Sequence, residues 1–128
     1  MSTWVWLACG GALGTAGRYA VTQAVVGLGG NTVLGTLAAN VSGSLLIGFV
    51  LTLLIEHAGG GASADLRIFL VTGILGGYTT FSTFAWDTTR LLREGALLRA
   101  VLNGFGSLCL GVLAVLVGIG CARLVLRA

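Results

Sequence analysis

The chain has 128 residues, enough for one domain, and 56% of them are hydrophobic while only 9% are charged. Together with a mean hydropathy of +1.02, this composition excludes an ordinary soluble domain. The net charge of +3 comes from arginines that flank apolar blocks, which excludes the clustered basic face of a nucleic-acid-binding protein.

Four apolar stretches predict four transmembrane helices, because a helix needs about 20 mostly apolar residues to cross the hydrocarbon core. They run from Thr3 to Val26, from Asn31 to Ile55, from Ile68 to Trp86 and from Ala100 to Ala122. Short connections join them, the last a charged elbow over residues 87–99. The sequence therefore predicts a single all-α transmembrane domain over residues 1–128. The 22 glycines, spread through apolar sequence, indicate close packing of its helices in lipid.

Arginines in the connections help to set the orientation of a membrane protein. One membrane face would carry the N-terminus, the second loop and the C-terminus, with three arginines in all. The other face would carry the first and third loops with three arginines, or four if Arg18 reaches it. This balance is what a dual-topology protein would have, with copies inserted both ways up, but counts this small also balance by chance.

Arg18 is the only charged residue of the first predicted span. It lies 15 residues past Thr3, or about 22 Å along a helix that rises 1.5 Å per residue. Two interpretations stay open at this point. The side chain either extends to the lipid headgroups or forms an electropositive vestibule that draws anions in.

In the second span, Asn40 lies near the middle of the membrane. Its amide offers donors and an acceptor, either to a passing ion or to an interhelical hydrogen bond. Ala39 and Gly43, like Ser44 and Gly48, are small residues four positions apart. This spacing predicts a helix-packing face.

The third span, IFLVTGILGGYTTFSTFAW, has Gly76 and Gly77 at its centre. Four hydroxyl residues follow, Thr79, Thr80, Ser82 and Thr83. A glycine pair frees the backbone to leave helical geometry, and broken helices in membranes are where ion sites are built. The alternative is a continuous helix that uses both glycines for close packing. In the fourth span, Asn103 and Ser107 lie four residues apart and therefore share a helical face.

Four segments together resemble the Fluc, or CrcB-like, fluoride channels. They are GGALGTAGRY (10–19), GTLAANVSGSLLIG (35–48), GILGGYTTFSTF (73–84) and NGFGS (103–107). The segments touch all four spans, and the GGxTTFSTF pattern within them is the specific element. The resemblance implies a fluoride-selective channel in a prokaryotic cell (inner) membrane, which exports fluoride and relieves its toxicity.

The resemblance also implies an assembly. Family members form antiparallel, dual-topology homodimers with two fluoride pores, each lined by both subunits. Their third helix is broken at its centre, and main-chain oxygens at the two breaks bind a structural sodium ion. In this chain those oxygens would be the carbonyls of Gly76 and Thr79.

The family's pore residues map onto this chain one by one. The paired phenylalanines correspond to Phe81 and Phe84, which share a helical face because they are three residues apart. The pore asparagine corresponds to Asn40, the vestibule arginine to Arg18 and the fourth-helix serine to Ser107.

Fluoride is small and strongly hydrated, so a pore must replace its water with other donors. The expected donors are the Asn40 amide, the hydroxyls of Ser82, Thr83 and Ser107, and the positive ring edges of Phe81 and Phe84. In a segment without the surrounding motif, such a phenylalanine pair would be interpreted as ordinary packing in lipid.

Two other kinds of membrane protein remain as alternatives. A small dual-topology secondary exporter would need a carboxylate deep in a span, whereas all the acidic residues are placed at or beyond the predicted span ends: Glu56, Asp65, Asp87 and Glu94. A structural subunit of a membrane complex would need only the glycine faces, and it leaves the polar centre of the third span unexplained. An enzyme is least expected, because no nucleophile–base pair or cluster of metal ligands is present.

Overall fold

The computed structural model describes residues 2–57 and 63–128, and nearly all of them are helical. The elements are α1 (Thr3–Gly27), α2 (Thr32–Thr52), η1 (Leu53–His57), α3 (Ala64–Arg67), η2 (Ile68–Leu75), α4 (Gly76–Tyr78), α5 (Phe81–Arg93) and α6 (Leu97–Arg127). η1 and η2 are π-helical stretches that continue α2 and α3 without a gap. The order confirms the helices expected from the four apolar stretches.

A glycine motif ends both α1 and α5. Gly29 and Gly95 have φ angles of 88° and 74°, a conformation that glycine adopts without steric cost. The amides of Gly29 and Gly30 donate to carbonyls of the last turn of α1 at 3.0 and 2.9 Å. The amides of Gly95 and Ala96 do the same for α5 at 3.1 and 2.9 Å. This is the Schellman pattern, which pairs carbonyls that a helix end leaves free.

The predicted charged elbow over residues 87–99 is wrong for most of its length, since ten of its thirteen residues are helical. α5 continues through it to Arg93, and α6 already begins at Leu97. The expectation followed the change from apolar to charged residues at Asp87, whereas the backbone stays helical until Gly95 permits a turn.

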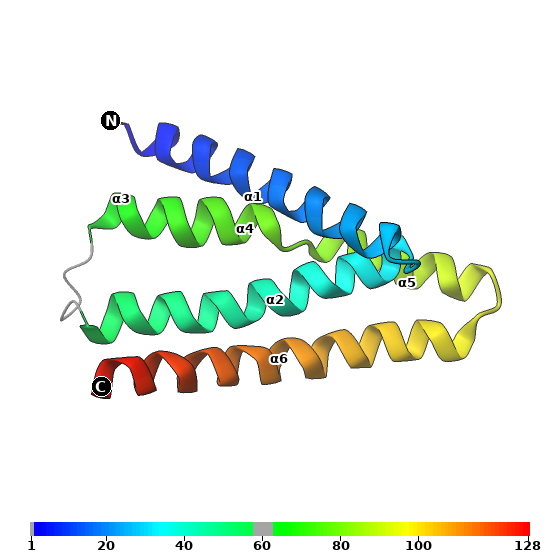
Figure 1. Cartoon of the computed structure of the whole chain (residues 1–128). Coiled ribbons are helices and arrows are strands. Elements are labelled where there is room, and N and C mark those ends of the chain that lie inside the picture. Colours follow the sequence, from blue (N-terminus) through cyan, green and yellow to red (C-terminus); the bar gives the residue numbers. More distant parts are fainter. Residues whose placement is uncertain (1, 58–62) are drawn as a thin grey trace.

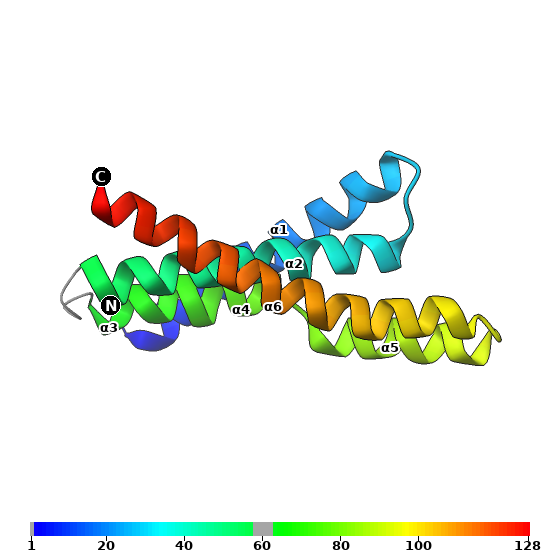
Figure 2. The same cartoon turned by 90° about the horizontal axis from the view of Figure 1, so that it is seen from below.

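The long helices run alternately in opposite directions (Figure 1). The N-terminus, the end of η1, α3 and the C-terminus gather at one end of the molecule, and the two glycine turns lie at the other. α5 runs beside the first part of α6, while α1 and the start of α2 diverge from that pair (Figure 2). The ends that were grouped for the arginine count therefore do lie together.

Glycines allow the helices to approach closely. α2 packs along α6, where a Cβ atom added at Gly48 would collide with the Val115 carbonyl. α1 packs along η2 and α4, where a Cβ atom at Gly77 would lie 2.7 Å from the Gly11 carbonyl oxygen. The expectation of close packing through glycine is confirmed at these contacts.

The interior consists mostly of small residues, and the large apolar side chains point outward. The buried apolar residues are Ala39, Leu75, Leu91, Ala100, Ala114 and Ala122. On α6, by contrast, Phe105 is 70% exposed. A soluble protein would bury such side chains, whereas a membrane protein can expose them to lipid.

Within the described residues, three helical stretches are long and apolar enough to cross a membrane. They are Thr32–Glu56, Ala64–Arg93 and Leu97–Arg127. α1 has 25 residues but is not among them, since Arg18 and several polar residues lower its apolar character.

Candidate functional site

The helix that begins at Ala64 is interrupted at Thr79 and Thr80, between α4 and α5. Thr79 has φ −86° and ψ 155°, and Thr80 has φ −149° and ψ 116°, so both are extended. The predicted break is confirmed, but its placement at the glycine pair is wrong. Gly76 remains helical with φ −65° and ψ −37°, because glycine permits a departure from helical geometry without requiring one.

Asn40 satisfies the backbone at the break. Its side-chain amide donates to the Thr80 carbonyl at 3.0 Å, and its side-chain oxygen accepts from the Thr80 amide at 2.8 Å. Unpaired backbone groups at this depth would each cost several kcal/mol, roughly, in an apolar medium. Of the two uses foreseen for Asn40, the interhelical hydrogen bond is therefore present.

Arg18 reaches the same region from α1. Its Nε donates to the Gly77 carbonyl at 3.2 Å, and the residue is half-buried. A cation is favourable at this position because the free carbonyls of α4 make its C-terminal end negative. Neither of the two interpretations of Arg18, at the headgroups or in a vestibule, anticipated this contact with the backbone at the break.

Three carbonyls of the break are left without a donor from the described residues. Hydrogen bonds reach the oxygens of Gly77 and Thr80, whereas none among those found in residues 2–57 and 63–128 ends on the oxygens of Gly76, Tyr78 or Thr79. Gly76 is also exposed, and a Cβ atom added there would meet only the Val71 carbonyl of its own helix, at 3.6 Å. The oxygens of Gly76 and Thr79 are those for which an external ligand was expected.

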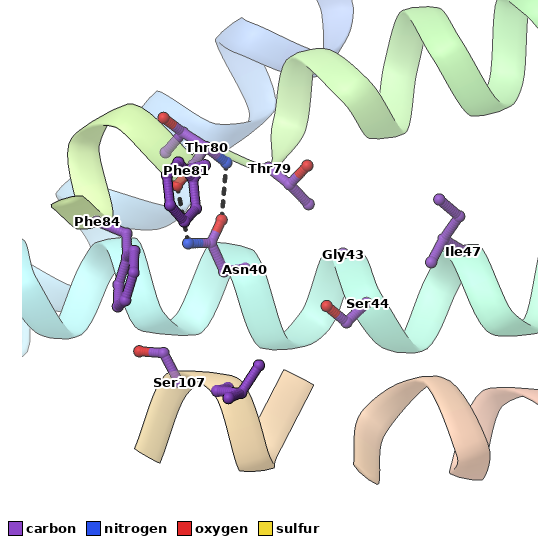
Figure 3. Close-up of a pocket in the computed structure, with 10 residues that line it drawn as sticks. Asn40, Gly43, Ser44, Ile47, Thr79, Thr80, Phe81, Phe84 and Ser107 are labelled. Carbon is purple, nitrogen blue, oxygen red and sulfur yellow. Dashed lines mark hydrogen bonds between the residues drawn. The ribbon is translucent and has the colours of Figure 1, made fainter. Parts of the chain in front are cut away.

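A cavity of about 340 Å³ lies beside the break, between α2, α5 and α6 (Figure 3). Four of the predicted pore residues line it: Asn40, Phe81, Phe84 and Ser107. They come from three different helices, α2, α5 and α6. The remaining lining residues were not assigned to a pore: Gly43, Ser44, Ile47, Thr79, Thr80 and Leu108. Ser44 could have been found, since it lies one helical turn beyond Asn40 on the same face.

The phenylalanine pair stands at the start of α5. The ring centroids of Phe81 and Phe84 are 5.6 Å apart, with 47° between the ring planes. Their shared face is thus confirmed. Phe81 is 79% exposed even though it lines the cavity. An aromatic ring left this open is available to a ligand or to a partner subunit.

Ser82, Thr83 and Arg18 do not line this cavity. The Thr80 hydroxyl accepts from the Thr83 amide at 3.2 Å and so caps α5. The same hydroxyl donates to the Thr83 hydroxyl at 3.1 Å and lies 3.3 Å from that of Ser82. These hydroxyls hold the start of α5, and their contact with an ion stays a prediction.

Asp87 lies in α5, directly after the apolar stretch that ends at Trp86, and is only 4% exposed. Its burial was not anticipated from the sequence. The Thr36 hydroxyl donates to its carboxylate at 3.2 Å, and Arg90 lies 3.7 Å away. The carboxylate is thus buried but partnered.

Comparison with known proteins identifies the family. A family described as "CrcB-like protein, Camphor Resistance (CrcB)" matches residues 5–119. A protein of Opitutus terrae named fluoride-specific ion channel FluC is 45% identical over 119 residues, which cover 92% of this chain and 90% of that protein. A protein of the same name from Thermus thermophilus is 42% identical, with 92% and 93% covered. Another, from Methylobacterium radiotolerans, is 40% identical, with 91% and 82% covered.

The matches confirm the resemblance, and these relatives are named as channels rather than as enzymes. The matched residues include the broken helix, the asparagine that pairs with it and the cavity beside it. The chain belongs to the CrcB-like protein family.

Proposed function

We propose that the protein is a fluoride-selective ion channel, which lets fluoride leave the cell and so relieves fluoride toxicity. The observation that carries this proposal is the cavity at the break, where Asn40, Ser107 and the phenylalanine pair converge. The family supports the same function, since its curated relatives carry the name of a fluoride-specific channel.

The cavity walls offer what a dehydrating fluoride ion needs. The Asn40 amide has two N–H groups, and only one of them is bound to Thr80, which leaves the other as a donor. The Ser107 and Ser44 hydroxyls and the positive edges of Phe81 and Phe84 add further contacts. Several weak contacts in series let an ion enter and also leave.

The proposal is tested by fluoride efflux from liposomes that hold the purified protein. We expect rapid fluoride release without a proton gradient, and no release of chloride under the same conditions. Chloride release at a similar rate would contradict selectivity. An absence of fluoride release from liposomes with correctly inserted protein would contradict the function itself.

A small secondary exporter and a structural subunit are the alternatives. The exporter is not favoured, because the relatives are named as channels. Fluoride efflux that stops when the proton gradient is removed would reverse this preference.

The proposed assembly is an antiparallel homodimer of four-span subunits in a prokaryotic inner membrane. It rests on the nearly equal numbers of arginines at the two predicted membrane faces, and on a subunit interior that consists mostly of small residues. The open surface at Gly76 and Phe81, beside the break, offers a place for the second subunit. Each subunit's cavity would then be completed by side chains of the other.

Dual topology is tested by a reporter fused to the C-terminus. We expect the reporter on both sides of the membrane in one cell population, since neither face carries an excess of arginine. Two lysines added after Ala128 should bias insertion to one orientation and lower fluoride flux. A single orientation of the unmodified chain would contradict the homodimer.

We further propose that a structural sodium ion binds the carbonyl oxygens of Gly76 and Thr79 from both subunits. Sodium prefers oxygen ligands, and these two oxygens have no donor among the described residues. No cluster of three or more metal-binding side chains was found in that part of the chain. Main-chain oxygens at the break are accordingly the ligands that the chain offers.

A further inference from the structure

Tyr78 ends α4, immediately before the break. Its ring lies between α1 and α2 in a slot that two glycines leave open. A Cβ atom added at Gly17 would lie 3.5 Å from one edge of the ring, and one added at Gly43 would lie 3.0 Å from the other. The contact at Gly17 would be ordinary, whereas the one at Gly43 would be too tight, so the position of the ring depends on the glycine in α2.

The Tyr78 hydroxyl has a specific partner in α2. Its oxygen lies 2.8 Å from the Ser42 hydroxyl oxygen. The Ser42 hydroxyl already donates to the Ala38 carbonyl, at 2.7 Å. Since a serine hydroxyl has one proton, Tyr78 must be the donor and Ser42 the acceptor.

This contact forms a pair with the one made by Asn40. Along α2, Asn40 and Ser42 are two residues apart; along the third helix, Thr80 and Tyr78 are also two residues apart, in the opposite order. These two hydrogen-bonded contacts between α2 and the third helix, which we call ties, therefore fix the position of the break along α2. Between them lies Thr79, whose methyl group fills the space beside Gly43.

We propose that Tyr78 and Ser42 are positioning residues for fluoride conduction. Their hydrogen bond holds the end of α4 against α2 on one side of the break, as Asn40 holds Thr80 on the other. Thr79, Thr80 and Phe81 line the cavity and follow Tyr78 directly. Without this tie, Asn40 alone would restrain the break, and the cavity wall would spend less time in the conducting arrangement. This inference rests on the proposed fluoride channel.

The test compares fluoride efflux for Tyr78→Phe, Ser42→Ala and the double variant. Each single variant removes the tie but keeps the ring or the small residue. We expect about fivefold lower flux per folded protein in each, the factor that one hydrogen bond of ordinary strength supplies. The double variant should be no slower than the singles, because both remove the same bond.

Tyr19→Phe is the matched control. Tyr19 lies on α1, is 67% exposed and makes no side-chain hydrogen bond found in the described residues. Its variant should conduct like the unmodified protein. Thermal unfolding and size-exclusion profiles should be nearly the same for every variant. The reason is that the tie is proposed to affect fluoride flux rather than folding.

Unchanged flux in Tyr78→Phe would overturn the inference, and so would a double variant about 25-fold slower, the product of two independent effects. A lower unfolding temperature with unchanged flux per folded protein would likewise reduce the tie to a structural contact. In all of these cases the unmodified protein still conducts fluoride. Its failure to do so would instead contradict the proposed function.

Discussion

Asn40 illustrates how one side chain can serve both the fold and the ion path. Its oxygen and one N–H group satisfy both backbone groups of Thr80, and the residue also faces the cavity. A backbone break inside the membrane needs such a partner, because lipid offers no hydrogen-bonding groups to replace it. The ion contact and the break therefore depend on the same amide.

We predict that Asn40→Ala destabilises the protein as well as lowering flux. The variant leaves the Thr80 amide and carbonyl without their partner, at a cost of about 1–3 kcal/mol for each group that stays buried and unpaired. The measurement is thermal unfolding in detergent beside fluoride efflux. Ser107→Ala serves for comparison, since Ser107 lines the cavity without a hydrogen bond to the break. Equal unfolding temperatures for both variants and the unmodified protein would show that the amide does not hold the break.

Phe81 and Phe84 are expected to act on the ion and not on the fold. Replacement of either by Ile keeps apolar bulk but removes the electropositive ring edge. Flux should fall by about tenfold in each variant, the effect of losing one such contact. The size-exclusion profile should be unchanged, since Phe81 is largely exposed in the subunit. Full fluoride efflux in both single variants would remove these residues from the ion path.

At the scale of the helices, glycine spacing decides which faces approach. Gly118 and Gly120 lie two residues apart on α6 but meet different surroundings. A Cβ atom at Gly118 would collide with the Leu45 carbonyl of α2, and one at Gly120 would meet nothing within 4 Å. The two positions therefore separate the effect of helix packing from that of glycine itself.

Gly118→Ala should lower the stability of the protein by about 1–3 kcal/mol, the usual cost of overpacking a tight contact. Gly120→Ala should leave it unchanged or raise it slightly, because alanine favours a helix by about 1 kcal/mol over glycine. Unfolding by heat or by denaturing detergent measures both. Similar stability in the two variants would mean that α2 and α6 do not pack as closely as described.

Local sequence predicted the helices well but placed the break only approximately. Apolar length and glycine turns are local signals, so the order and number of long helices could be anticipated. The break depends on Asn40, which lies 40 residues from its partner Thr80, and no local pattern reveals that pairing. The break was therefore predicted at the glycine pair, whereas Gly77 in fact allows close contact with Gly11.

The same limit of local sequence explains which site residues were predicted correctly and which were not. Phe81, Phe84, Asn40 and Ser107 could be assigned because the family motif names them, and the fold brings them to one cavity. Ser82 and Thr83 have suitable hydroxyls, but at the start of α5 these hydroxyls contact that of Thr80, which caps the helix. The burial of Asp87 was not anticipated, because it depends on Thr36, which lies 51 residues away in α2.

For the whole molecule, the question is what covers the surface at the break. The subunit leaves Gly76 open and Phe81 exposed at the depth where two antiparallel copies would meet. The proposed sodium ion would lie there, between the carbonyls of Gly76 and Thr79 from both copies. The ion would also satisfy oxygens that otherwise lack a donor in a dry environment.

Gly76→Val tests this arrangement because Gly76 is exposed in the subunit and has room for a Cβ atom. We expect the helices to form normally, since nothing within the described residues blocks a Cβ atom at Gly76 closer than 3.6 Å. The dimer should dissociate, because the valine would stand where the second break approaches. Thr79→Ser should leave the dimer and its response to sodium intact, since it keeps both the carbonyl and a hydroxyl able to bind the Leu75 carbonyl and loses only the methyl group beside Gly43.

The readouts are circular dichroism for the helices, size-exclusion chromatography for the dimer, and thermal unfolding with sodium or with a bulky organic cation in its place. The unmodified dimer should unfold at a lower temperature without sodium, because the carbonyl oxygens of both breaks would lose their shared ligand. Gly120→Val is the control, since Gly120 is equally open but lies far along α6 from the break. A Gly76→Val dimer that remains intact and still responds to sodium would place the ion, and the axis of the dimer, elsewhere.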